Sequence, residues 1–336
     1  MRILLDVMGG DHPPRELIQG GIEVGHLRGC EVVFAGDPQT IETALSSFGE
    51  SSGGMFHILP CSEIVRMDDP PVRAVRQKSD SSMVRGLAAL ADGTVDAFVS
   101  PGNTGAVVAA SLFTLGRIPG IPRPGILAPL PTLEGPDTYL IDVGATSDCH
   151  AEHLLHFAQM GATYAREVAG IAAPRVGLLN IGAEPGKGNR LMTKTFALLE
   201  ASDLGFAGNI EAHQITQRPA DLIVSDGFTG NICLKAIEGS VSAVSGLLKR
   251  SVRGSIRAKI GALLMNRAFD TLRAAVSYQA RGGAPLLGVN GIVVIAHGRS
   301  DAKTIASAMD VAHREVEAGL AARISQAAAQ ARTHGS

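Results

Sequence analysis

Six glycine-rich segments carry Asn, Thr, Asp, Lys or His directly after an apolar run. They are residues 6–11, 100–106, 142–148, 180–189, 225–231 and 297–301. Free backbone N–H groups and hydroxyls at helix starts, with a lysine nearby, favour an anion and phosphate above all. For any one segment the alternative is structural, because glycines turn the chain and Asn, Asp or Thr cap helices. The six together predict a phosphate-binding site.

Two of these segments repeat one pattern. Residues 96–106 and 221–231 share D-x-x-V-S-x-G-x-T-G. The repeat could be chance, since turns between strands and helices favour glycine. The interpretation that we prefer is that two matching loops face one ligand across a cleft.

Apolar runs alternate with helical stretches along the chain. Expected strands, continuous in Val, Ile and Leu, cover residues 2–7, 31–36, 96–100, 125–130, 138–143, 175–181, 220–227 and 291–298. Expected helices cover residues 14–28, 72–92, 104–117, 150–170, 190–203, 230–250 and 300–331. This alternation predicts a mainly parallel, doubly wound sheet, with the six segments at the carboxyl ends of strands. We expect residues 1–336 to form a single α/β/α unit, with two intertwined subdomains as the alternative.

The composition narrows the class of protein. The 336 residues include 40 glycines, only 4% aromatics and no Trp, which disfavours a protein that stacks nucleic-acid bases. Thirty Lys and Arg balance 32 Asp and Glu, so no global field attracts DNA. The four scattered cysteines indicate reduced thiols in the cytosol, and we expect neither a signal peptide nor a membrane span.

Familiar cofactor and metal motifs fail on inspection. Residues 182–188 read GxxxGKG, one residue short of a P-loop, and no dinucleotide fingerprint, nucleophile elbow or HExxH is present. Cys149, His150, His153 and His156 lie near one another and could bind a metal, although a solvated helix face is the simpler interpretation. We therefore expect no metal and no cofactor.

The motifs in their order resemble the PlsX family of phosphate acyltransferases over essentially the whole chain. They are DVMGGDHPP (6–14), MDDPPVRAVRQKSDSSM (67–83), GNTGA (102–106), IDVGATSDCHAEHLLHFAQMG (141–161), LLNIGAEPGKGN (178–189), DGFTGN (226–231), GGAPLLGVNG (282–291) and AHGRSDAK (296–303). The resemblance implies a three-layer α/β/α sandwich like that of phosphotransacetylases and isopropylmalate dehydrogenases. It also implies a homodimer that transfers a fatty acyl group from acyl carrier protein to inorganic phosphate. The acyl phosphate product would pass to a glycerol-3-phosphate acyltransferase in phospholipid synthesis.

Such a reaction needs an anion pocket rather than a nucleophilic triad, because phosphate is itself the nucleophile. The expected catalytic residues are Lys187, Asn103, Asp226 and His297. Those expected to bind phosphate or substrate are Asp6, Gly9, Gly10, Asp11, Gly102, Thr104, Gly105, Asn189, Thr229, Gly230, Asn231 and Gly283. For Asp226 the alternative is a helix cap or a pair with Lys187, and for His297 a hydrogen-bonded turn residue. Pro101, Thr146 and residues 211–215 depart from the family pattern, which bears on substrate preference and rate.

Residues 239–283 predict a basic amphipathic helical hairpin. The segment holds eight Lys and Arg and one acid, Asp270. Its apolar and basic residues at helical spacing are Leu248, Lys249, Val252, Arg253, Ile256, Arg257 and Ile260. The pattern suits an anionic membrane surface, an acidic carrier protein or packing against a dimer partner. With the resemblance, it favours a cytoplasmic protein held peripherally at the inner face of the cell membrane.

Three other functions stay open from the sequence. They are a phosphotransacetylase-like enzyme that uses acyl-CoA, a non-catalytic scaffold at the membrane, and an NAD-dependent dehydrogenase suggested by fold analogy alone. A charged glycine pocket argues against the scaffold, and the missing fingerprint argues against the dehydrogenase.

Overall fold

The computed structural model describes residues 1–11, 14–133, 135–253 and 282–334, with the single positions 257, 261 and 265. One sheet crosses this part of the chain in the order β3-β2-β1-β4-β11-β10-β5-β6-β9-β7-β8. Its strands are β1 (Arg2–Asp6), β2 (Glu31–Gly36), β3 (Phe56–Pro60), β4 (Ala97–Ser100), β5 (Gly125–Leu130), β6 (Thr138–Ile141), β7 (Arg175–Asn180), β8 (Gly205–Glu211), β9 (Leu222–Val224), β10 (Ala284–Leu287) and β11 (Ile292–Ile295).

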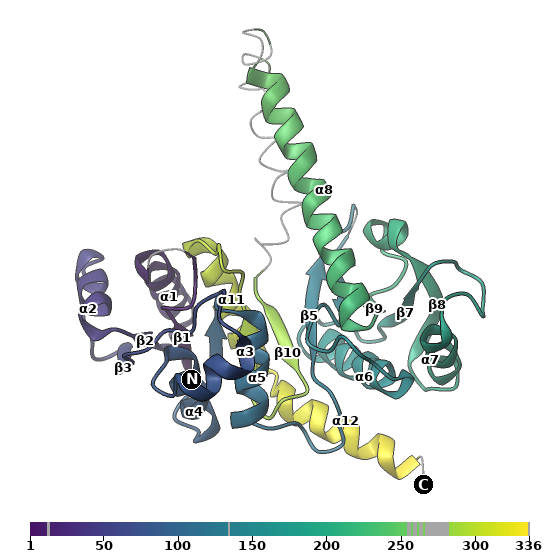
Figure 1. Ribbon diagram of the computed structural model, residues 1–336, viewed down its shortest axis with the longest axis horizontal. Helices are drawn as coiled ribbons and strands as arrows, with labels where there is room; N and C mark the ends of the chain where they lie inside the picture. Colours follow the sequence, from purple (N-terminus) through teal and green to yellow (C-terminus); the bar gives the residue numbers. More distant parts are fainter. Residues whose placement is uncertain are drawn as a thin grey trace.

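Helices cover both faces of the sheet (Figure 1). One apolar core holds residues of α1 (Pro14–Arg28), α2 (Pro38–Ser47), α6 (Ala151–Glu167), α7 (Arg190–Glu200), α11 (Ala302–Glu317) and α12 (Leu320–His334). The other holds residues of α3 (Pro71–Gln77), α4 (Ser82–Ala91), α5 (Thr104–Thr114), the 3₁₀ turn η1 (Ala212–Gln217) and α8 (Gly227–Arg253). The predicted three-layer α/β/α sandwich is therefore confirmed.

The sheet is mostly parallel, as predicted, but its two parallel parts run in opposite directions. Strands β3, β2, β1, β4 and β11 form one part, and β6, β9, β7 and β8 form the other. Between them, β10 and β5 pair antiparallel with their neighbours. Strands of the two parts therefore point in opposite directions on the two sides of the central β10–β5 pair.

Two predicted helices are each divided in two. The stretch 72–92 separates into α3 and α4, because Ser81 caps the second helix by accepting a hydrogen bond from the Val84 N–H. The stretch 300–331 separates into α11 and α12 at Gly319, whose φ of 59° is left-handed and is best tolerated by glycine.

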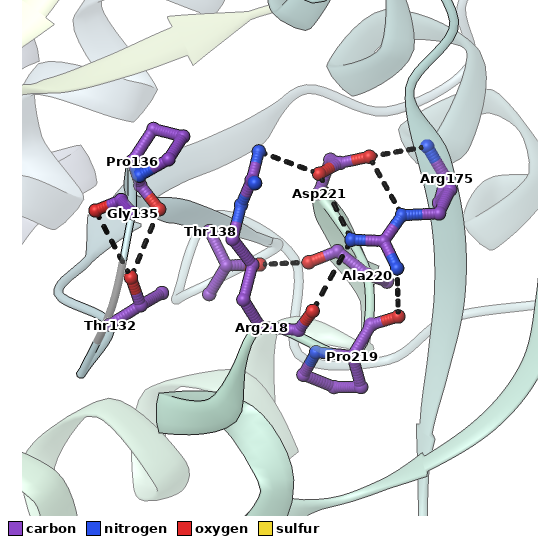
Figure 2. A network of polar contacts seen from close by, with 9 residues as sticks. All are labelled: Thr132, Gly135, Pro136, Thr138, Arg175, Arg218, Pro219, Ala220 and Asp221. Atoms are coloured by element: carbon purple, nitrogen blue, oxygen red, sulfur yellow. Dashed lines mark hydrogen bonds and ion pairs between the residues drawn. The ribbon is translucent and has the colours of Figure 1, made fainter.

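An ion-pair network around the buried Asp221 joins the amino ends of β6, β7 and β9 (Figure 2). Asp221 is 5% exposed and pairs with Arg175 at 3.2 Å and Arg218 at 2.8 Å. The Thr138 hydroxyl donates to the Ala220 carbonyl at 2.6 Å. The network lies at the strand ends remote from the loops that follow β6 and β9, so it stabilises the sheet without entering those loops.

Helix α8 starts in the body of the protein and extends away from it (Figure 1). Val244, Leu247 and Leu248 on its outer part are 65%, 58% and 38% exposed. Of the predicted hairpin 239–283, the described residues are 239–253, 257, 261, 265 and 282–283. Ile256, Ile260 and the side chains of Lys249 and Arg253 lie outside the described residues. None of the described helices combines the length and apolar content needed to cross a bilayer.

Candidate functional site

A cavity of about 330 Å³ lies between α5 and α8, over the central strands where the sheet reverses direction. Its apolar lining comes from Ile126, Val143, Leu234, Ala284 and Ile295. Its polar lining comes from Thr104, Asn231, Lys235, Glu238, His297 and Thr304. Gly105, Gly144, Gly282 and Ala296 complete it. The cavity thus joins an apolar floor to a wall of hydroxyl, amide, ammonium and imidazole groups.

The first turn of α5 contributes one wall. Asn103 caps this helix, since its Oδ1 accepts from the Ala106 N–H at 3.0 Å. Its Nδ2 donates to the carbonyls of Met67 and Asp69 at 2.9 and 3.2 Å. The first-turn amides that follow, at Thr104 and Gly105, have no acceptor within the helix and lie at the cavity. They can bind an anion there.

The loop after β1 supports this wall from below. The fully buried carboxylate of Asp6 accepts from the hydroxyls of Ser82 at 2.6 Å and Ser100 at 2.8 Å, and Ser100 accepts from the Gly102 N–H. A Cβ on Gly9 would lie 2.7 Å from the Asp6 carboxylate. Asp6 and Gly9 therefore position the α5 loop and do not face the cavity.

The loops after β6 and β9 form the opposite wall. A Cβ on Gly144 would lie 2.7 Å from Nδ2 of Asn231, and one on Gly230 would overlap the Asp142 carbonyl oxygen. Asp226 caps α8, its Oδ1 accepting from the Thr229 N–H at 2.9 Å. The repeated pattern thus has matching roles, because Asn103 and Asp226 both cap helices that begin at one cavity.

Asp142 organises the loop after β6. The backbone N–H groups of Ile126, Gly144, Ala145 and Thr146 all donate to its carboxylate, at 2.7 to 2.9 Å. Burial raises the pKa of Asp142 to about 6, despite these four donors. Its charged form is consequently less favourable in the folded protein than in the unfolded chain.

Asp142 should make stability depend on pH. A folded pKa of about 6 against an ordinary 3.8 means that wild-type protein, relative to Asp142→Asn, should lose about 3 kcal/mol of unfolding free energy as pH rises from about 4 to about 6. The asparagine keeps an oxygen acceptor but cannot titrate. Urea unfolding of both proteins across this range measures the effect. A difference between them that stays constant with pH would contradict it.

A cation that the sequence analysis did not select lies in the cavity. Lys235 on α8 is one helical turn after Asn231, and its Nζ lies 2.9 Å from Oε2 of Glu238. The other oxygen of Glu238 is buried and has no hydrogen-bond partner among the described residues. Glu238 therefore orients Lys235, whose side chain is 57% exposed and free to meet an anion. Only the four-residue spacing from Asn231 could have revealed it.

His297 lines the same cavity as this lysine. The Arg299 N–H donates to Nδ1 at 3.1 Å, so the neutral ring carries its proton on Nε2. Burial, and next the charge of Lys235, lower the pKa of His297. A neutral imidazole with an Nε2–H is a hydrogen-bond donor that suits a developing oxyanion.

Comparison with known proteins identifies the family. The model of a fatty acid synthesis protein family matches residues 1–323. The phosphate acyltransferase of Heliobacterium modesticaldum is 44% identical over 97% of both chains. That of Geobacillus thermodenitrificans is 43% identical over 94% of this chain and 95% of its own. The chain belongs to the phosphate acyltransferase family.

Solved structures of other enzymes share the fold of this chain. A phosphotransacetylase from Streptococcus pyogenes superposes with a TM-score of 0.63 over 94% of each chain, at 16% identity. A branched-chain phosphotransacylase from Enterococcus faecalis gives 0.57 over 94% of this chain and 99% of its own, at 13% identity. A 4-hydroxythreonine-4-phosphate dehydrogenase from Klebsiella pneumoniae gives 0.56 with the same coverage, at 14% identity. At these identities the likeness shows the fold alone.

Only some of the predicted site residues line the cavity. Those that do are Thr104, Gly105, Asn231 and His297. Outside the residues that line it lie Asp6, Gly9, Gly10, Asp11, Gly102, Asn103, Asp226, Thr229, Gly230 and Gly283. Gly282 lines the cavity beside Gly283, whose Cβ position is taken up by β11.

Lys187 and Asn189 lie elsewhere, in the loop after β7. Lys187 is 51% exposed and pairs with Glu184 at 4.0 Å, and Asn189 caps α7 by accepting from the Met192 N–H at 3.0 Å. Neither lines the cavity described above. Their part in catalysis stays a prediction.

The histidines that the sequence brings close together, His150, His153 and His156, lie at the start of α6. The His150 N–H donates to Nδ1 of His153 at 3.1 Å, and Nδ1 of His156 contacts the Glu152 carbonyl. Within the described ranges, no three His, Cys, Asp or Glu side chains gather as a metal site would require.

Proposed function

We propose that this phosphate acyltransferase takes its fatty acyl group from the thioester of acyl carrier protein and gives it to inorganic phosphate. The observation that carries the proposal is the cavity, where anion-binding groups stand over an apolar floor. A small anion and an acyl chain need these two surfaces side by side. No side-chain nucleophile is needed, since phosphate oxygen attacks the thioester carbonyl directly.

The described groups suit each step. The α5 amides at Thr104 and Gly105 and the Lys235 ammonium hold phosphate beside the carbonyl. As the new C–O bond forms, Nε2–H of His297 and the Asn231 amide donate to the tetrahedral oxyanion. The C–S bond then breaks and the thiol leaves as a thiolate, which needs little acid assistance at a pKa of about 8.5. The products are acyl phosphate and free carrier protein.

The experiment is phosphate-dependent trapping of the product. Purified protein is incubated with long-chain acyl carrier protein or acyl-CoA, with and without phosphate, and hydroxylamine captures any acyl phosphate. We expect product only with phosphate and a clear preference for the carrier thioester. A preference for short acyl-CoA would support a phosphotransacetylase-like activity. No product from either donor would overturn the enzymatic proposal and favour the scaffold.

We further propose that the protein is a homodimer and that the outer part of α8 contacts an anionic membrane peripherally from the cytoplasm. The membrane contact is supported by exposed Val244, Leu247 and Leu248 beside exposed Arg250, because apolar and basic residues together suit a lipid surface. There the acyl phosphate could pass to a glycerol-3-phosphate acyltransferase. Replacing Leu247 and Leu248 with serine should lower binding to vesicles of anionic phospholipid several-fold without loss of soluble activity. Unchanged vesicle binding would argue against the proposal, and sedimentation would measure the dimer.

A further inference from the structure

The motif MDDPPVRAVRQK, at residues 67–78, has no part in the chemistry above, yet it borders the cavity. Pro71, the first residue of α3, lies against Gly105, where an added Cβ would be 2.9 Å from its ring. The Met67 and Asp69 carbonyls accept from the Asn103 amide. The Met67 side chain also reaches Gly298, in the loop that follows β11, where an added Cβ would be 3.1 Å from its terminal methyl group. The segment is thus fixed to the rim of the anion site.

The outer side of this segment combines unpaired positive charge with exposed apolar surface. Arg73 and Arg76 are exposed, and within the described ranges neither meets a carboxylate. Arg76 instead lies over the ring of Phe113, 5.2 Å from its centroid. Phe113 is 54% and Val72 48% exposed. An arginine held over an exposed aromatic ring is typical of a protein-binding surface.

The surface is also hollowed and carries a net positive charge. A depression of about 510 Å³ is lined by Pro70, Pro71, Val72, Arg73, Arg76 and Gln77. Arg66 is exposed nearby. Of the two acids in residues 66–77, Asp69 is neutralised by Lys78 and Asp68 is exposed. An acidic partner with a protruding apolar side chain would complement both the charge and the shape.

We propose that α3 and Phe113 form the docking surface for the acidic carrier protein that presents the acyl thioester. This inference rests on the proposed function, since it assigns a position to the donor of that reaction. Docked here, the carrier would stand beside the first turn of α5, and its flexible arm would enter the cavity past Gly105. Neither the exposed apolar residues of α8 nor its basic residues are required for this contact.

The test is the double variant Arg73→Glu/Arg76→Glu, measured with acyl carrier protein as substrate and with unacylated carrier as ligand. We expect kcat/KM and carrier affinity to fall by roughly tenfold to a hundredfold, with kcat at saturating carrier nearly unchanged. Wild-type affinity should weaken as salt is raised, and that of the variant should respond less. Phe113→Ala, which keeps both charges, should give a smaller loss. Arg166→Glu/Lys194→Glu, on exposed positions of α6 and α7, is the matched control.

The outcomes separate this inference from the proposed function. If wild-type protein forms no acyl phosphate from the carrier thioester, the proposed function fails. If wild-type protein is active and the Arg73/Arg76 variant keeps its carrier affinity and kcat/KM, the docking surface is wrong. Equal losses in the α6/α7 control would show a general charge effect and would also overturn the docking surface. The docking surface would also be overturned if the Arg73/Arg76 variant lost vesicle binding while its kinetics with the carrier stayed intact, because the surface would then bind lipid.

Discussion

Replacing Lys235 with methionine should lower kcat/KM by about two to three orders of magnitude, the usual loss when one charge-stabilising donor is removed from an active site. The lysine lines the cavity and is positioned by Glu238 at 2.9 Å. Methionine preserves length and packing but cannot bind phosphate. Because the side chain is 57% exposed, thermal stability should change little. The hydroxylamine assay at varied phosphate concentration gives the kinetic constants, and we expect a raised KM for phosphate.

Two further variants make this result specific. Lys187→Met removes a lysine that is similarly exposed but lies outside the cavity, so the cavity geometry predicts a smaller loss than at position 235. Glu238→Gln retains a hydrogen-bonding group while removing the charge that holds Lys235, and we expect an intermediate loss with a raised KM for phosphate. Activity above a third of wild type in Lys235→Met would contradict the assignment. If activity is lost in Lys187→Met but not in Lys235→Met, the lysine that binds phosphate is Lys187, in the loop after β7.

Gly230→Ala should destabilise the protein by about 3 kcal/mol or more, at or above the upper end of the usual cost of core overpacking. The new methyl group would overlap the Asp142 carbonyl oxygen, which is backbone and cannot rotate away. The loop after β6 would then separate from the start of α8, and the cavity wall at Gly144 and Asn231 would be lost with it. Urea unfolding measures the stability, and activity should fall in parallel.

Gly239→Ala is the matched control on the same helix. In the part of the chain that the structure describes, a Cβ at Gly239 meets nothing within 4 Å. Alanine there should stabilise α8 by up to about 1 kcal/mol through helix propensity alone. Equal effects of the two substitutions would show that crowding at Asp142 is not the cause.

The fold could be predicted because buried parallel strands appear in the sequence as continuous apolar runs. The strands that were not predicted lack such a run. Strands β3 and β8 lie at the two edges of the sheet and are only partly buried, so no continuous apolar run marks them. Strand β10 contains Pro285 and is flanked by Gly283 and Gly288, so its sequence is more typical of a turn than of a strand. The opposite direction of the two parallel parts depends on β10 and β5, and for that reason it was also missed.

The site was predictable as a set of loops but not as a set of contacts. Glycine turns with Asn, Asp and Thr predicted an anion site, and Thr104, Asn231 and His297 do lie at one cavity. The sequence left open whether Asn103 and Asp226 bind the ligand or cap helices, and the structure shows that both side chains are caps. Nor could the sequence show that Lys235 rather than Lys187 lines the cavity, because only the folded sheet determines which segments surround it.

The place of β11 between β4 and β10 constrains how the protein can be made. As the chain leaves the ribosome, residues 1–130 present β4 with an unpaired edge, and residues 125–224 present β5 with another. Both edges stay open until residues 284–295 arrive to join them. Until that moment the cavity lacks Ala284 and Ile295, and His297 and Thr304 follow later still, so the site is completed late in synthesis. Throughout this interval, open strand edges expose the nascent chain to aggregation.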